Sequence, residues 1–326
     1  MAMPCKRFVA MFGEHMSYSA SAPGSLMLLG EHAVLQNKRA MVLAVDKRIM
    51  VTLVPRKDKR VIIHASLGKL ERHLDDLVIE KPFQFVCAAI LALKEQFTLG
   101  FELSIVSEFS DTVGLGSSAA VTVATMAVLL QMLEKQPEPL VLLTHAKAIV
   151  AAVQGVGSGA DVAASIYGGV VLYQQNPPYV LQQFAHTVPL VVVYSGAKTP
   201  TPEVIKWVES RRQHYPALYD SLFAAMDCSV GDAVPLIEQE NWPKLGELFN
   251  VQHSLMNAIG VGSPILNQLT DVLNSMAGIY GAKISGSGLG DCVIGLGNAE
   301  PLQEHLHIPG AMVIPVSGSR EGIRCE

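Results

Sequence analysis

The segment Ala119–Leu133 limits most strongly how this chain can fold. Its fifteen residues carry no charge, and Gly114 and Gly116 lie just before it. Apolar side chains at this density in a helix need burial on every side. The segment is too short to span the roughly 30 Å of hydrocarbon in a bilayer, and two threonines and a glutamine interrupt it. It therefore predicts a helix buried in the core of the protein.

The composition of the chain predicts a folded protein with one large domain or two. The chain has 326 residues, of which half are apolar and 16% are charged. This apolar content excludes disorder as the main state, and domains commonly contain about 100–200 residues. The formal net charge is −5. Because phosphate neutralisation needs clustered Lys and Arg side chains, this balance argues against a nucleic-acid-binding protein.

The cysteines and the N-terminus indicate the compartment. The chain has five cysteines without a CxxC spacing: Cys5, Cys87, Cys228, Cys292 and Cys325. An odd number of widely spaced cysteines fits neither a disulfide framework nor a zinc site. Near the N-terminus, Lys6 and Arg7 are followed by Gly13, Glu14 and His15 rather than by an apolar segment. We therefore expect no signal peptide, no membrane partner and a cytoplasmic enzyme.

The order of the predicted elements indicates the α+β class. Runs of apolar and β-branched residues predict strands over residues 17–29, 40–54, 61–65, 101–106, 168–173, 188–194, 282–285, 291–296 and 312–316. Apolar residues at helical spacing predict helices over residues 82–97, 117–133, 139–153, 202–212, 216–229, 241–258 and 263–277. Strands dominate the first half and helices the second, which is typical of an α+β protein. We expect two domains, 1–186 and 187–326.

The glycine segment before the buried helix has the features of an anion site. Gly114 and Gly116 allow close approach of the backbone to a ligand, and Ser117 is a candidate N-cap. The first turn of the helix would offer N–H groups and the positive end of the helix dipole. The Ser118 hydroxyl could reach a magnesium ion bound to phosphates. The segment is neither a Walker A loop nor GxGxxG, and an ordinary glycine turn remains an alternative.

Three further segments carry candidate functional groups. Early in the chain, Glu31 and His32 follow Gly30 at the end of a predicted strand. Late in the chain, residues 285–292 place three glycines between two predicted strands, where a tight turn or a close ligand is expected. In the middle, Asp161 follows a run of three glycines. It is either an N-cap or a carboxylate held for chemistry.

Together these motifs resemble those of the GHMP kinases, which phosphorylate galactose, homoserine, mevalonate or phosphomevalonate. The order agrees: Ala22-Pro23-Gly24 with Gly30-Glu31-His32-Ala33-Val34, then Gly114–Ala120, then Ser285–Cys292. The resemblance covers roughly residues 18–297. It implies two domains, an N-terminal one similar to ribosomal protein S5 domain 2 and a C-terminal one that is ferredoxin-like. It also implies ATP-dependent phosphorylation of a small-molecule alcohol.

The resemblance also implies roles for individual residues. ATP phosphates are expected on Gly114, Leu115, Gly116, Ser117 and Ser118. Ser118 would be a ligand of Mg²⁺, and Asp161 would be the catalytic residue that takes the proton of the acceptor hydroxyl. Residues expected to contact the acceptor are Glu31, His32, Lys198, Thr201, Gly286, Ser287 and Gly288.

The acceptor itself is not fixed by the motifs. The stretch Gly30–Val34 looks like that of members that phosphorylate mevalonate to 5-phosphomevalonate. The stretches Gln154–Asp161 and Gly290–Cys292 look more like those of members that act on 5-phosphomevalonate. We expect mevalonate as the acceptor, with 5-phosphomevalonate as the alternative. The expected partners are ATP, Mg²⁺ and the alcohol, and we allow for a homodimer.

Two positions depart from the family pattern. Ser25 stands where the family usually has a lysine, and Val150 stands where a glutamate metal ligand is usual. A catalytically weak binding protein with the same fold is therefore an alternative function. We expect instead that another lysine takes the place of the missing one, and the candidates are Lys47, Lys198 and Lys283.

Overall fold

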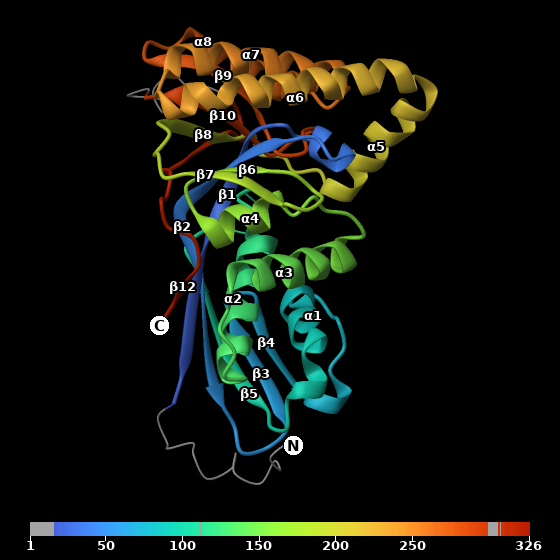
Figure 1. Ribbon diagram of the computed structural model, residues 1–326, viewed down its shortest axis with the longest axis vertical. Helices are drawn as coiled ribbons and strands as arrows, with labels where there is room; N and C mark the ends of the chain where they lie inside the picture. The colour runs from blue at the N-terminus through green and yellow to red at the C-terminus, as the bar shows by residue number, and fades with distance from the viewer. Residues whose placement is uncertain (1–15, 111–112, 299–305, 307) are drawn as a thin grey trace.

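The computed structural model describes residues 16–110, 113–298, 306 and 308–326 (Figure 1). Cys5 and the N-terminal residues that argue against a signal peptide lie outside these ranges. Four cysteines within them are free: Cys87, Cys228, Cys292 and Cys325. In the described part of the chain, no helix is long and apolar enough to cross a membrane.

The first domain is built on a large sheet. Within the described ranges this sheet has eight strands: β1 (Tyr18–Leu29), β2 (Ala40–Pro55), β3 (Arg60–Ala65), β4 (Gly68–His73), β5 (Phe101–Ser107), β6 (Val170–Tyr173), β7 (Val180–Phe184) and β12 (Arg324–Cys325). The strand order is β12-β1-β2-β5-β3-β4, with β6 paired to β2 and β7 paired to β6. The β3–β5 pair is parallel, and the other pairs are antiparallel.

Helices lie against this sheet (Figure 1). They are α1 (Gln84–Ala92), α2 (Ser117–Met132), α3 (Pro139–Gln154) and α4 (Ala160–Tyr167). The prediction of a buried core helix is confirmed, because twelve of the sixteen residues of α2 are buried. An Ala-rich helix of this kind can pack closely against strands and other helices at once. The predicted helix over residues 82–97 is shorter in the structure, and a 3-10 turn at Lys94–Gln96 follows it.

The second domain has its own antiparallel sheet and a layer of helices. Among the described residues, its strands are β8 (Leu190–Tyr194), β9 (Ile279–Ser285), β10 (Cys292–Gly297) and β11 (Met312–Ile314), in the order β11-β8-β10-β9. Its helices are α5 (Thr201–His214), α6 (Pro216–Glu238), α7 (Trp242–Ala258) and α8 (Pro264–Ser275). Figure 1 shows α6, α7 and α8 at one end of the molecule, over this sheet. The α+β class is confirmed.

The two domains share buried side chains. One apolar cluster joins Leu26 and Leu28 of β1 to Val192 of β8 and to Phe249 of α7. The predicted division near residue 186 falls between β7 and β8, where the chain leaves the first sheet for the second. The C-terminal segment then returns, since β12 pairs with β1. The last residues of the chain therefore belong to the first sheet.

Candidate active site

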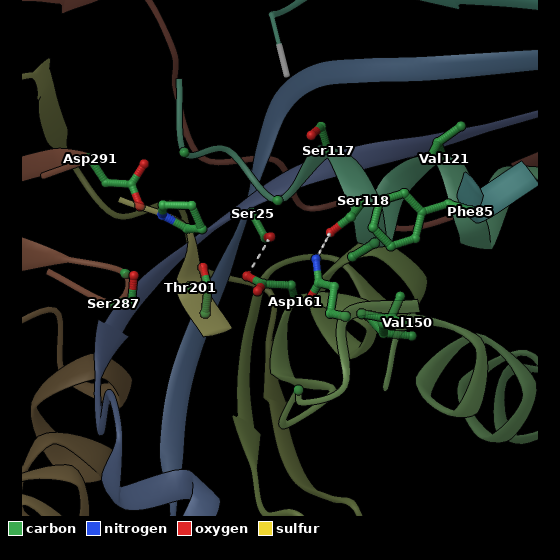
Figure 2. Close-up of a pocket in the computed structure, with 18 of the residues that line it drawn as sticks. Ser25, Phe85, Ser117, Ser118, Val121, Val150, Asp161, Thr201, Ser287 and Asp291 are labelled. Carbon is green, nitrogen blue, oxygen red and sulfur yellow. Dashed lines mark hydrogen bonds between the residues drawn. The ribbon is translucent and has the colours of Figure 1, made fainter. Parts of the chain in front are cut away.

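A cavity of about 880 Å³ lies where the predicted motifs meet. Its wall contains residues from the turn after β1, from the loop before α2, from the start of α4 and from the loops that flank β8 and β10. Figure 2 shows Ser25 and Asp161 between two groups of side chains. Ser117, Ser118 and Phe85 lie on one side, and Thr201 and Asp291 lie on the other.

The loop before α2 has the backbone conformation that its glycines predict. Gly114 and Gly116 have φ values of 69° and 65°, in the left-handed region that favours glycine. Gly116 is the N-cap of α2 and has no side chain to fill the first turn. The prediction that Ser117 is the N-cap is therefore wrong, because Ser117 is already the first residue of the helix. A first turn without a side-chain cap is suited to an anion.

Asp161 lies in the first turn of α4, and its side chain is partly buried on the cavity wall. The hydroxyl of Ser25 donates a hydrogen bond of 2.8 Å to its Oδ1 atom (Figure 2). Burial raises the pKa of Asp161, and this hydrogen bond acts in the opposite direction. The backbone N–H of Ser25 also donates to the carbonyl of Leu115, at 3.0 Å. Ser25 therefore links the carboxyl group to the glycine loop.

Glu31 does not point freely into the cavity. It forms an ion pair with Lys283 of β9, and both side chains are almost completely buried. Gln252 of α7 donates to the other oxygen, Oε2, at 3.0 Å. The Lys283 ammonium also lies 3.4 Å from the carbonyl oxygen of Met27, near the end of β1. Both oxygens of Glu31 thus have partners from the second domain.

His32 also connects the two domains. Its φ is 59°, and its Nε2 atom lies 2.8 Å from the carbonyl oxygen of Ser287. Burial lowers the pKa of His32, which favours the neutral ring. A carbonyl can only accept a hydrogen bond, so Nε2 carries the proton and donates it. The Gly-Glu-His turn therefore holds the late glycine loop against the first domain.

The structure brings most of the predicted site residues to one cavity. Those on its wall are Glu31, His32, Gly114, Gly116, Ser117, Ser118, Asp161, Lys198, Thr201, Gly286 and Ser287. Leu115 has its side chain in the apolar core instead. Gly288 packs against Val261, whose carbonyl oxygen lies 2.6 Å from the position a Cβ atom would take. Neither of these two residues forms part of the wall.

The three lysines expected to replace the missing one have different surroundings. Lys283 is engaged with Glu31. Lys198 lies on the cavity wall, and its charge lowers the pKa of Asp291. Lys47 is not among the wall residues. Lys198 is therefore the one of the three that reaches the cavity wall, but burial and Ser25, rather than a lysine, act on the pKa of Asp161.

Oxygen donors on the wall fit a magnesium ion. The Ser118 hydroxyl accepts a hydrogen bond of 3.4 Å from the Gln154 amide (Figure 2), and the carboxyl group of Asp161 lies on the same wall. Magnesium in phosphate sites commonly takes one or two side-chain oxygens and completes its shell with phosphates and water. Val150 also lies on this wall, and it offers no ligand atom.

Several wall residues were missed by reasoning from sequence. The part of the cavity near α1 is apolar and includes Phe83, Phe85 and Ile105. The sequence places these residues in a predicted helix and a predicted strand and indicates no role in a site. Asp291 is 5% exposed, and burial raises its pKa to about 6. The signal for Asp291 in the sequence is its position directly after three closely spaced glycines.

Comparisons with known proteins agree with this geometry. The family model for the N-terminal domain of GHMP kinases matches residues 84–169, and the model for their C-terminal domain matches residues 233–309. A mevalonate kinase of Pyrococcus horikoshii is 33% identical, over 94% of this chain and 97% of that protein.

Solved structures show the same fold. The mevalonate kinase of Methanococcus jannaschii has a TM-score of 0.78 at 23% identity, covering 94% of this chain and 99% of that one. A phosphomevalonate kinase of Streptococcus pneumoniae, solved with phosphomevalonate and AMPPNP, has a TM-score of 0.75 at 18% identity, covering 92% and 99%. At these identities the two structures show the shared fold alone.

The fold, the site and these matches define an ATP-dependent small-molecule kinase. The two-domain architecture, with its glycine loop at the start of α2, is that of kinases that act on small alcohols. The chain belongs to the GHMP kinase family.

Proposed function

We propose that this protein transfers the γ-phosphoryl group of ATP to the 5-hydroxyl of mevalonate, giving 5-phosphomevalonate for isoprenoid precursor synthesis. The observation that carries this proposal is the similarity to the mevalonate kinase of Pyrococcus horikoshii, which extends over nearly the full length of both chains. The motifs on the cavity wall are consistent with that reaction.

The charges on the wall favour mevalonate over 5-phosphomevalonate. Among the described wall residues, Lys198 is the one lysine or arginine, whereas four residues carry carboxyl groups: Glu31, Glu108, Asp161 and Asp291. Mevalonate carries a single carboxylate, which one ammonium group can balance. A phosphate ester adds about −1.5 to −2 at neutral pH. Such an acceptor would need more positive charge than this wall supplies.

The phosphates are proposed to lie on Gly114, Gly116, Ser117 and Ser118, at the N-terminus of α2. Backbone N–H groups there would stabilise the charge that develops on the transferred group. Ser118 would contribute a ligand to Mg²⁺, which when bound neutralises phosphate charge. The apolar part of the cavity around Phe85 would receive the nucleoside. Binding at these places orients the γ-phosphoryl group toward the acceptor.

Asp161 is proposed to take the proton of the reacting hydroxyl. Its carboxyl group lies at the boundary between the glycine loop and the acceptor residues (Figure 2). The hydrogen bond from Ser25 fixes its orientation and favours the ionised form that acts as a base. Lys198 and Thr201 are proposed to contact the acceptor, together with Ser287 and Gly286. Glu31 and His32 act on the acceptor through the loop that they hold.

An ADP-release assay tests this function. The protein is incubated with Mg²⁺ and ATP and, in parallel, with mevalonate, 5-phosphomevalonate, homoserine or galactose. We expect turnover with mevalonate and a phosphorylated product identified by mass spectrometry. Asp161→Asn is the matched control: it keeps the shape of the side chain, and kcat is expected to fall by about 10²-fold or more while ATP affinity is kept.

Other outcomes of the assay identify the alternatives. Faster turnover with 5-phosphomevalonate would replace the proposed acceptor. Tight ATP binding without turnover on any of the four alcohols would favour the binding protein. The cytoplasmic location and the homodimer stay predictions, and sedimentation of the purified protein would test the second.

A further inference from the structure

Two buried polar atoms of residues on the cavity wall have no hydrogen-bond partner in the described part of the protein. They are Oγ of Ser287 and Oδ1 of Asp291. A buried carboxylate oxygen without a partner is costly, because it has lost water and gained nothing in return. Such an atom on a cavity wall indicates that a bound ligand supplies the partner.

The backbone fixes the Asp291 side chain in this place. The N–H of Asp291 donates to the carbonyl of Ala197 at 2.8 Å, and its carbonyl accepts from the N–H of Ser195 at 2.9 Å. Its φ of 65° lies in the left-handed region, which is uncommon for a residue with a side chain. Oδ1 lies 3.0 Å from the position that a Cβ atom would take on Gly114. The carboxyl group thus lies directly against the glycine loop, on the cavity wall.

The charges around Asp291 restrict the kind of ligand group that can bind to its Oδ1 atom. Burial raises the pKa of Asp291 to about 6, Lys198 lowers it, and Asp161 raises it. The carboxyl group is therefore mostly ionised at pH 7 and can only accept hydrogen bonds. A second carboxylate within electrostatic reach makes an anion unfavourable in the space between them. A neutral donor, such as a hydroxyl group, satisfies Oδ1 at no electrostatic cost.

We propose that Asp291 accepts a hydrogen bond from a second hydroxyl group of the acceptor, one that is not phosphorylated, and so selects alcohols that carry two hydroxyl groups. This inference rests on the proposed function. Asp161 receives the hydroxyl that reacts, and Figure 2 shows Asp291 across the cavity from it, beside Thr201 and Ser287. In mevalonate the reacting group is the 5-hydroxyl, and the group that meets Asp291 is the 3-hydroxyl.

The contact between Asp291 and the 3-hydroxyl is tested by combining one substitution in the protein with one change in the substrate. The wild type and Asp291→Ala are assayed with mevalonate and with an analogue that has hydrogen in place of the 3-hydroxyl. With mevalonate, kcat/KM is expected to fall by about 10- to 100-fold, the usual range for a lost hydrogen bond to a charged group. With the analogue, the two proteins are expected to differ by less than about threefold.

Two further variants keep the test decisive. Asp291→Asn preserves the size of the side chain and is used if the alanine variant does not fold. Glu108→Gln is the matched control, since Glu108 also lies on the wall but already accepts a hydrogen bond of 2.8 Å from the N–H of Arg48. This control is expected to affect both substrates equally.

The outcomes separate this inference from the proposed function. Equal losses with mevalonate and with the analogue would overturn the role of Asp291 while leaving mevalonate as the substrate. An increased requirement for Mg²⁺ in Asp291→Asn, with equal losses on both substrates, would make Asp291 a metal ligand and would also overturn it. Failure of the wild type to phosphorylate mevalonate would instead contradict the proposed function.

Discussion

Burial and a hydrogen bond act in opposite directions on the carboxyl group of Asp161. Burial alone favours the protonated acid, which cannot take a proton from a substrate. The Ser25 hydroxyl donates to the ionised form and favours it. Serine brings no charge, so this is a smaller effect than a neighbouring ammonium would have. Burial thus raises the pKa of the proposed base, and a neutral neighbour offsets part of that rise.

Ser25→Ala is expected to move the acidic limb of the pH profile of kcat to higher pH. Without the hydrogen bond the pKa of Asp161 rises further, so less of the base is ionised at a given acidic pH. Activity should fall most below neutrality and recover as the pH increases. Ser165→Ala is a suitable control, since Ser165 on the same helix bonds the carbonyl of Pro23 at 2.8 Å. An unshifted limb in Ser25→Ala would contradict this account.

Asp291→Asn is expected to stabilise the ligand-free protein at alkaline pH. The folded state raises the pKa of Asp291 from 3.8 to about 6, so the wild type loses stability as the pH rises from about 4 to about 6. The asparagine variant has no titrating group at this position, so its stability lacks this dependence on pH. The gain in the free energy of unfolding at pH 8 should approach about 3 kcal/mol, and it should vanish near pH 4. Urea unfolding of both proteins at the two pH values measures it, and equal differences at both would refute it.

At the scale of elements, the Gly-Glu-His turn and β9 form one unit across the domain boundary. Glu31 and Lys283 lie in a region that water does not reach, so each charge depends on the other. Ser285 of β9 adds a hydrogen bond of 3.0 Å to the carbonyl of Met27. The late glycine loop begins directly after this strand. The position of this loop on the cavity wall is therefore supported by the buried ion pair.

Lys283→Met is expected to lower the free energy of unfolding by about 3–5 kcal/mol, because it leaves the Glu31 carboxylate buried without its counter-ion. The double variant Glu31→Gln with Lys283→Met removes both charges and should recover most of that loss. Lys59→Met is the control for an exposed ion pair with Asp75, and it should cost less than about 1 kcal/mol. Urea unfolding measures all three, and a double variant as unstable as Lys283→Met would argue against the pair.

The motifs and long periodic segments could be predicted from the sequence, whereas several elements could not. Helix α6 continues to Glu238, beyond the predicted end at residue 229, through Gly231 and Pro235. The missing side chain of Gly231 makes room for the guanidinium of Arg39, which is 2.9 Å from where its Cβ would be. Arg39 is distant from Gly231 in the sequence, and only the tertiary fold brings the two residues together. Local propensity is overridden by such tertiary contacts.

The same reason explains what was missed in the site. The charged partner of Glu31 is 252 residues away in sequence, and neither residue carries a local signal for it. The strand β12 was not predicted either, because two residues are too short for a periodic pattern. Asp161 and the glycine loop before α2 could be singled out because their signal is local: glycines lie close to each of them in the sequence. Two buried charges that pair across a long stretch of sequence leave no comparable local pattern by which they could be predicted.

At the scale of the whole molecule, the C-terminal segment returns to the helix that carries the proposed base. Arg48 of β2 donates to the carbonyl of Gly322 at 2.7 Å, and the N–H of Ile323 donates to the carbonyl of Ile166 on α4 at 3.1 Å. The same helix begins with Asp161 in its first turn. The end of the chain therefore contacts the helix that carries Asp161, although its described residues are not part of the cavity wall.

Gly322→Ala is expected to lower both stability and kcat. A Cβ atom on Gly322 would overlap the backbone carbonyl of Ile166, so the segment or α4 must move. Overpacking of this kind costs about 1–3 kcal/mol, and a shift of α4 displaces the Asp161 carboxyl group from Ser25. Gly318→Ala on the same segment is the matched control, because its nearest neighbour would be the Leu43 side chain at 3.4 Å, an ordinary contact. Thermal unfolding and the ADP-release assay are compared for the two variants. If both retain the Tm and the kcat of the wild type, the C-terminal segment has no part in placing α4, and Asp161 is held by the rest of the first domain.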